Sequence, residues 1–185
     1  MRVAADRFRM VGVVRVDPPL SPAEFEYLTA FAESRRWRRP GGPYVVPGNP
    51  LAECLEPAFD LTRYAVPADG QPGLRCPWFP AQRGRALVLA HPPAGDPGAS
   101  ADEVAAWLRY LIDHFLRSGA QAAGSGDERF GQFSFDHVLD GSAAVCDQRT
   151  GLLTVIYVDA NRVWVEPLGP HKHVAAADPA QRKAG

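Results

Sequence analysis

Apolar residues recur at intervals of three and four in two segments of the chain, the pattern of a helix with one buried face. The first predicted helix begins at Ser21, which forms a Ser-x-x-Glu capping box with Glu24. Its apolar face consists of Phe25, Leu28, Phe31 and Ala32. The second begins at Ser100, which forms the same box with Glu103. Its apolar face consists of Val104, Trp107, Leu108, Leu111, Ile112 and Phe115.

Short apolar runs and alternating apolar positions predict five strands, at residues 11–16, 86–89, 133–145, 152–158 and 163–165. Within the third, Asp140-Gly141 is either a hairpin turn or a kink in one long strand. Turns at residues 148–151 and 159–161 connect the last three segments. These three segments are therefore predicted to form an antiparallel meander.

Prolines recur throughout residues 40–85 and exclude a long helix or a central strand there. Aromatic residues are interleaved with them, whereas disordered segments are poor in such residues. They are Tyr44, Phe59, Tyr64, Trp78 and Phe79. The segment is therefore predicted to be a long ordered loop, fixed to the core by aromatic anchors. Such a loop can present further side chains in one geometry, and Arg75 and Trp78 are expected to be its exposed contact residues.

These elements predict an α+β domain with two helices packed on one face of a mostly antiparallel sheet, in the order β-α-long loop-β-α-β-β-β. Residues 1–166 form a single domain, and residues 167–185, rich in Ala, Lys and Pro, form a flexible C-terminal tail. With 185 residues, 46% of them hydrophobic, the chain can bury a core without metal or disulfide staples.

The formal net charge of −1 gives no indication of a nucleic-acid or membrane partner. No apolar segment is long enough for a transmembrane helix, and the N-terminus does not resemble a signal peptide. The cysteines Cys54, Cys76 and Cys146 form no C-x-x-C motif and cannot all pair with one another, which is typical of a reducing compartment. We therefore expect a cytoplasmic protein with free thiols.

An arginine-rich segment, Arg35 to Arg39 around Trp37, follows the first helix and has the composition of a phosphate- or base-binding patch. Positive charge at a helix C-terminus also complements the helix dipole. The same residues therefore fit a solvated helix end with Trp37 packed inward. Trp37, Arg38 and Arg39 are candidate contacts with a partner, although the net negative charge of the chain argues against nucleic acid.

Three fragments contain residues used in catalysis or metal binding, and each has a simpler structural interpretation. Adjacent strand residues point to opposite faces, so Asp136 and His137 cannot easily hydrogen-bond to each other, and a packed histidine is favoured. Cys76 is followed by a proline, which removes a backbone N–H of the kind oxyanion holes use, so a structural cysteine is favoured. His171 and His173 lack the further ligands of a closed zinc site. No catalytic residue, cofactor or metal is predicted.

The segment Gly70 to Pro80 is GQPGLRCPWFP, and the segment Trp107 to Leu116 is WLRYLIDHFL. These motifs resemble those of a family of bacterial proteins without an established activity. In that family a G-Q-P-G-L-W-C-Q-W-x-P motif precedes a W-L-x-Y-L-I-x-H-F-L helix and several strands. The resemblance extends over residues 10–166 and implies the fold and the order of its elements. Arg75 and Pro77 stand where the family has Trp and Gln, and residues 91–95 replace an acidic segment.

The sequence is compatible with three functions, and whether the chain is an enzyme stays open. The preferred one is a non-enzymatic interaction protein that binds a protein or small-molecule partner through the Pro/aromatic loop, because aromatic and Arg side chains make good anchors. The second is a small enzyme or small-ligand-binding protein with a pocket between that loop and the sheet. The third is a nucleic-acid-associated protein that uses the Arg35–Arg39 cluster.

Overall fold

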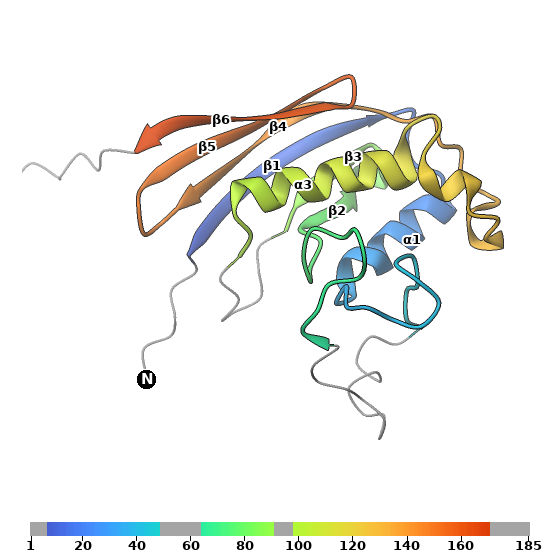
Figure 1. Cartoon of the computed structure of the whole chain (residues 1–185). Coiled ribbons are helices and arrows are strands. Elements are labelled where there is room, and N and C mark those ends of the chain that lie inside the picture. Colours follow the sequence, from blue (N-terminus) through green and yellow to red (C-terminus); the bar gives the residue numbers. More distant parts are fainter. Residues whose placement is uncertain (1–6, 49–63, 91–97, 171–185) are drawn as a thin grey trace, which may run out of the picture.

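The fold has two layers, a six-stranded sheet and a layer of helices and loops on one of its faces (Figure 1). The computed structural model describes residues 7–48, 64–90 and 98–170. The described strands are β1 (Phe8–Asp17), β2 (Trp78–Ala81), β3 (Ala86–Leu89), β4 (Val138–Asp147), β5 (Leu152–Asp159) and β6 (Arg162–Pro170). The described α-helices are α1 (Pro22–Glu33) and α3 (Ala101–Leu111). The predicted α+β class, with two helices and an antiparallel sheet, is confirmed.

The strand order is β2-β3-β1-β4-β5-β6, and every neighbouring pair is antiparallel. The longest pairing joins β1 to β4 at the centre, with Phe8 opposite Asp147 and Asp17 opposite Val138. The strands β4, β5 and β6 form the predicted meander. Because β1 lies between the meander and the β2–β3 hairpin, the first strand of the chain ties the two halves of the sheet together.

Both helices begin at their predicted capping serines, and α1 has both hydrogen bonds of the predicted box. The Ser21 hydroxyl accepts a hydrogen bond from the Glu24 amide at 3.3 Å, and the Glu24 carboxylate accepts one from the Ser21 amide at 2.7 Å. Ser100 caps α3 through the amide of Glu103 at 3.3 Å. All six residues of the predicted apolar face of the second helix are buried. No helix of the described ranges is long and apolar enough to cross a membrane.

The second helix does not continue as a regular α-helix to its last apolar residue. It passes at Ile112 into a π-helical turn, Ile112–Leu116, in which the amide of Arg117 donates to the carbonyl of Ile112 at 3.1 Å. The wider turn keeps Phe115 and Leu116 fully buried, while Asp113 and His114 lie half-buried at the surface. Such turns are rare and are often found at functional sites.

Gly141 lies inside β4, which continues through it as one strand, so Asp140-Gly141 is not a hairpin turn. Its φ of 149° lies in the range that side chains rarely adopt, and a Cβ at this position would lie 2.6 Å from the carbonyl oxygen of Val13. Glycine therefore allows the two central strands to approach each other closely.

The predicted strand start at residue 133 is wrong, because β4 begins at Val138. Phe135 has a φ of 52°, which interrupts the extended backbone and turns the following residues. The amide of His137 then donates to the carbonyl of Leu116 at 3.0 Å, at the end of the π-helical turn, and not to a neighbouring strand. The segment before β4 thus connects the sheet to the helix layer.

The predicted loop at residues 40–85 contains a strand at its C-terminal end. β2 pairs with β3, with Trp78 opposite Leu89 and Pro80 opposite Leu87. A proline fits there because β2 is an edge strand, where a missing N–H costs no ladder hydrogen bond. The prediction of a loop is therefore wrong for these four residues.

The core between the layers is rich in aromatic rings that pack edge to face. Tyr27 of α1 lies 5.4 Å from Phe115 and 5.3 Å from Phe130, measured between ring centroids. Phe31 lies 6.1 Å from Trp107 of α3 and 5.3 Å from Phe115. This geometry adds about 0.5–1.5 kcal/mol per pair beyond the area buried. The cluster joins both helices to the segments that follow them.

Candidate functional site

A buried arginine organises the described part of the Pro/aromatic loop. Arg36 is 1% exposed, and its guanidinium lies 3.9 Å from the ring centroid of Phe31. It donates hydrogen bonds to the Ser34 hydroxyl at 2.9 Å, to the Val45 carbonyl at 3.1 Å and to the carbonyl of Pro43. Burial lowers the pKa of Arg36 to about 10, so the group keeps its charge at neutral pH. One side chain thus fixes the end of α1 to the loop.

The backbone and Gln71 complete this arrangement. The Arg36 amide donates to the Leu74 carbonyl at 2.8 Å, and the Arg36 carbonyl accepts from the Ala68 amide at 3.0 Å. The Gln71 amide group donates to the Pro43 carbonyl at 2.7 Å and to the Tyr110 hydroxyl at 3.3 Å. The described parts of the loop are therefore held by polar contacts as well as by aromatic anchors. Phe59 lies outside the described residues.

The expectation that Trp78 is an exposed contact residue is wrong. Its side chain is 1% exposed, and its indole N–H donates to the carbonyl of Val104 on α3 at 2.9 Å. The reason is that Trp78 starts β2 and turns its ring toward the helix layer. Arg75 is exposed, as expected. The pair proposed as one contact surface is thus split between the surface and the core.

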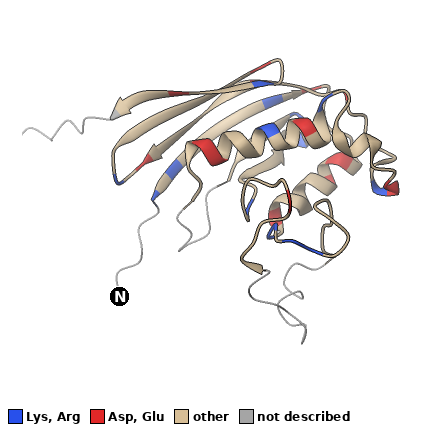
Figure 2. Cartoon of the chain, in the orientation of Figure 1, with Lys and Arg blue, Asp and Glu red and all other residues tan. Residues whose placement is uncertain are grey.

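The arginines around Trp37 do not form one solvent-facing patch. Arg39 is buried with its guanidinium 5.1 Å from the Trp37 ring centroid, and Arg35 lies 4.3 Å from the Tyr64 ring centroid. Arg38 is exposed and forms an ion pair with Asp69. Trp37 itself is half-buried. In Figure 2, acidic and basic residues are both dispersed over the sheet and the helix layer. The expected role of Arg39 as a surface contact is therefore not supported by its position.

A charged pair is fully buried where α1 begins. The side chains of Glu24 and His137 are both 0% exposed, and Oε1 of Glu24 lies 3.1 Å from Nε2 of His137. Nδ1 of His137 lies 2.7 Å from the carbonyl oxygen of Pro18, which can only accept a hydrogen bond. Nδ1 must therefore donate, and the Glu24 carboxylate beside Nε2 favours a second proton there, which makes the ring an imidazolium paired with a carboxylate. Asp136 lies 4.0 Å from Nδ1.

The surroundings favour the charged forms of both groups. Burial by itself raises the pKa of Glu24, but hydrogen bonds from His137 and from the backbone amides of Ser21 and Ser134 outweigh it and hold this pKa at about 2. Burial by itself lowers the pKa of His137, but its hydrogen bonds with Glu24 and Pro18 outweigh it, so the pKa is raised above its ordinary value of 6.5.

The cluster contains Ser, His and Glu but does not have the geometry of a catalytic triad. In a triad the serine and the acid contact opposite nitrogens of the imidazole. Here the Ser134 hydroxyl and the Glu24 carboxylate both lie at Nε2, at 3.2 Å and 3.1 Å, and Ser134 also hydrogen-bonds Glu24 directly at 3.1 Å. The cluster therefore links α1, Pro18 and the segment before β4, and it does not activate the serine.

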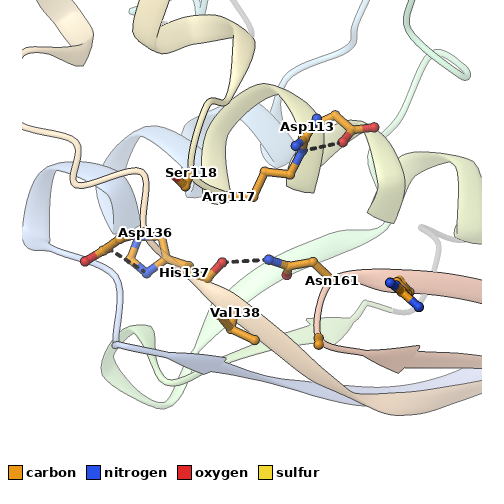
Figure 3. A pocket seen from close by; sticks show the side chains of 9 residues that line it. Asp113, Arg117, Ser118, Asp136, His137, Val138 and Asn161 are labelled. Carbon is orange, nitrogen blue, oxygen red and sulfur yellow. Dashed lines mark hydrogen bonds and ion pairs between the residues drawn. The ribbon is translucent and has the colours of Figure 1, made fainter.

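An open pocket of about 450 Å³ lies beside this cluster (Figure 3). The π-helical turn, the start of β4 and the turn between β5 and β6 line it. Its lining residues are Asp113, Arg117, Ser118, Asp136, His137, Val138, Ala160, Asn161 and Arg162. Asp113 and Arg117 form an ion pair at 2.7 Å. Asn161 fixes one wall, because its side chain donates to the His137 carbonyl at 2.9 Å and accepts from the Leu139 amide at 2.8 Å. Charges of both signs thus stand close together at this pocket.

The described cysteines form no disulfide. Cys76 and Cys146 are free thiols, as expected, and Cys54 lies outside the described residues. Cys76 is buried, and burial raises its pKa to about 12, so it is not a thiolate at neutral pH. Within the described ranges no group of three or more His, Cys, Asp or Glu side chains could hold a metal ion.

A Tyr–His contact lies at the edge of the aromatic core. The Tyr44 hydroxyl lies 2.7 Å from Nδ1 of His114, and the His114 ring stacks on Tyr110 with 3.9 Å between centroids. Burial lowers the pKa of His114, which keeps the ring neutral at neutral pH. This contact anchors the loop to the π-helical turn.

The sheet face opposite the helices is uncovered, because the described part of the chain places no helix or loop there (Figure 1). Strand register aligns one residue of each strand in a row across this face: Phe79, Val88, Val13, Ser142, Tyr157 and Trp164. A second row contains Val11, Ala144, Val155 and Glu166. Val11 is 70% exposed, Val13 50% and Trp164 45%. We call these two rows the open face.

The open face and the role of Glu24 were not predicted from the sequence. A signal for the face was present in residues 11–16, where valines occupy positions that point to both faces of β1. Val14 and Val16 point to the buried face, and Val11 and Val13 point to the exposed face. Glu24 was explained locally by the capping box, so nothing in its spacing indicated the contact with His137.

Fold and surface together define this chain as a two-layer α+β domain with one sheet face uncovered in its described part. Comparisons with protein-family models, with curated proteins and with solved structures found no match.

Proposed function

We propose that this chain is a non-enzymatic interaction protein that binds a protein partner through the open face of its sheet. The observation that carries the proposal is the exposure of Val11, Val13 and Trp164 within two neighbouring rows of mostly apolar residues. Exposed apolar residues scattered singly need no explanation, whereas a contiguous apolar patch marks an interaction site. In the central row one hydroxyl side chain, Ser142, separates the valines from the aromatic pair.

The aromatic end of the row supports a protein partner. The rings of Tyr157 and Trp164 stack with 5.5 Å between their centroids, so each is held in place before binding. Tyr and Trp are enriched among the residues that dominate interface energies, and prior ordering lowers the entropy cost of association. The proposed contact surface therefore moves from the Pro/aromatic loop to the sheet, and Arg75, Arg38 and Trp37 remain candidates for secondary contacts.

Site-specific photo-crosslinking in cells tests this proposal. A photo-reactive phenylalanine analogue at Val13 is expected to give a covalent protein adduct, because Val13 lies in the centre of the open face. The same analogue at Glu26, an exposed residue of α1, is the matched control and is expected to give none. The proposal fails if position 13 yields no adduct, or if both positions yield the same adducts.

The pocket beside Asn161 supports a second candidate, the binding of a small ligand. Asp113, Arg117 and Asp136 place both signs of charge around it, which suits a small molecule that carries an ammonium and a carboxylate. Free amino acids titrated into the labelled protein are expected to shift the amide resonances of Ser118 and Asn161, and Arg117→Ala is expected to weaken the effect at least about tenfold. Unchanged resonances at millimolar amino acid would rule this candidate out.

A further inference from the structure

We infer that the partner of the open face is a second copy of this chain, bound face to face about a two-fold axis. This inference rests on the proposed function and specifies its partner. Three properties of the face support it: its area, its apolar composition and the placement of two charges at its margin.

The area of the open face is close to the least that a specific dimer needs. The strands β1, β4, β5 and β6 give a width of roughly 19 Å over the roughly 20 Å from Arg9 to Arg15, and the four-residue strands β2 and β3 add roughly 10 Å by 13 Å. Two such faces in contact cover roughly 1,000 Å² in total, about the minimum for a biological interface. A short peptide bound along one strand would leave most of the apolar rows exposed.

The composition of the face is also that of an interface core. The central row consists of Val, Phe, Tyr and Trp apart from Ser142, and the charged residues Arg9, Arg15, Asp140 and Glu166 lie at its margins. Apolar and aromatic residues inside a charged margin are typical of interfaces between identical subunits. Face-to-face packing of two sheets about 10 Å apart buries such rows in the way a β-sandwich does.

Two of the marginal charges are left for a partner. Arg15 is paired with Asp140 at 3.5 Å. Arg9 and Glu166 are exposed, and neither forms an ion pair with any described residue. In the register, Glu166 lies three strands away from Arg9 and one row nearer the centre. Arg9 therefore lies beyond the second row on β1, and Glu166 ends that row on the edge strand β6.

A two-fold axis between two copies brings Arg9 of each copy to Glu166 of the other, which gives two ion pairs. In an isologous interface, residue i of one copy meets residue j of the other, and j meets i. With strands about 4.8 Å apart and about 3.3 Å per residue, the line equidistant from Arg9 and Glu166 crosses the central row between Val13 and Ser142. An axis along this line places Arg9 of each copy opposite Glu166 of the other. It also places Trp164 of each copy beside Val11, the more exposed of the two valines.

Sedimentation velocity of the purified chain tests the inference directly. The wild-type chain is expected to sediment, as its concentration rises, toward a dimer with twice the chain mass of 20.1 kDa. Val13→Asp is expected to weaken the dimer at least about a hundredfold, because it buries an unpaired charge. Glu26→Arg on α1 is the matched control and is expected to leave the dimer unchanged. Far-UV circular dichroism and the Tm show that each variant is folded.

Charge reversal tests the symmetry. Arg9→Glu or Glu166→Arg alone is expected to weaken the dimer about tenfold or more, because each opposes like charges twice in one dimer. The double reversal is expected to restore the wild-type affinity, since it re-forms both ion pairs with their directions exchanged. A folded double variant that stays as weak as the single variants overturns the two-fold arrangement.

The outcomes separate this inference from the proposed function. A wild-type chain that stays monomeric overturns the inference, as does a dimer unaffected by Val13→Asp. If the chain is monomeric and position 13 crosslinks to a different protein in cells, the open face keeps its proposed function and only the identity of the partner is wrong. If the chain is monomeric and position 13 gives no adduct, both proposals fail.

Discussion

Replacing Glu24 with glutamine is expected to lower the free energy of unfolding by about 3–5 kcal/mol, because it leaves the imidazolium of His137 buried without its counter-charge. Oε1 of Glu24 also accepts the Ser134 amide at 2.7 Å, and Oε2 accepts the Ser21 amide at 2.7 Å. The amide NH₂ of glutamine faces one of these donors and cannot accept from it. Urea unfolding at pH 6 measures the effect.

The exposed neighbour Glu26 provides the control for this experiment. Glu26→Gln lies on the same helix, removes the same charge and is expected to change the free energy of unfolding by less than about 0.5 kcal/mol. A loss below about 1 kcal/mol for Glu24→Gln would contradict the buried ion pair, since a carboxyl group that carried no charge could be replaced by an amide at little cost.

The same pair predicts how stability depends on pH. The pKa of His137 is raised above 6.5 by folding, so its contribution is complete below about pH 6.5 and is lost as the pH rises through the folded pKa. The pKa of Glu24 is lowered from 4.5 to about 2, so its contribution is complete above about pH 4.5 and is lost as the pH falls toward 2. The stability due to the pair is therefore greatest between about pH 4.5 and 6.5, and Glu24→Gln should flatten both limbs of the profile.

The helices were predictable from sequence because their determinants are local. A capping serine, an acidic residue three positions later and an apolar stripe lie within one short segment, so the segment beginning at Ser100 specifies its own start and its buried face. The passage into a π-helical turn at Ile112 was not predictable in this way. The hydrogen bond from the His137 amide to the Leu116 carbonyl is made there with a residue 21 positions away.

The strand before His137 was predicted wrongly because alternation of residue types does not encode backbone dihedral angles. Phe133 and Phe135 alternate with polar residues as a strand would, yet Phe135 takes a positive φ. Tertiary contacts account for this conformation: the Phe133 ring packs 5.5 Å from Tyr27, and the Ser134 amide donates to Glu24. The candidate site depends on these contacts across the chain, so its residues could be seen singly in the sequence but not as a cluster.

The open face was missed for a different reason. In a strand of an antiparallel sheet with one solvent-exposed face, apolar and polar residues alternate along the sequence. The segment Val11 to Val16 departs from that rule, and a strand with apolar residues on both faces is ordinarily read as buried on both. The described chain covers one of these faces, and the proposed dimer covers the other. Under this interpretation the sequence of β1 already encodes the interface.

Replacing Arg36 with methionine is expected to lower the free energy of unfolding by about 2–4 kcal/mol, the second large effect. Hydrogen bonds to charged groups contribute about 1.5–3 kcal/mol each, and removing a buried cation recovers part of its desolvation cost. The carbonyl groups of Pro43 and Val45 and the Gln71 side chain lose a donor together. Methionine keeps the packing against Phe31, so the loss reports the polar contacts rather than a cavity.

The loss of stability caused by Arg36→Met is expected to be largest in the loop segment that the Arg36 side chain holds. The backbone hydrogen bonds of Arg36 with Leu74 and Ala68 do not depend on its side chain, so residues 68–74 should keep part of their protection from hydrogen exchange. The amides of Tyr44 and Val45, beside the carbonyl groups that the guanidinium holds, should exchange faster by the factor that corresponds to the loss in local stability. Arg38→Met removes an exposed arginine two positions away and is expected to change neither quantity, because surface ion pairs contribute little. Equal effects of the two substitutions would contradict the role of Arg36, since the loop would then be held by its aromatic anchors alone.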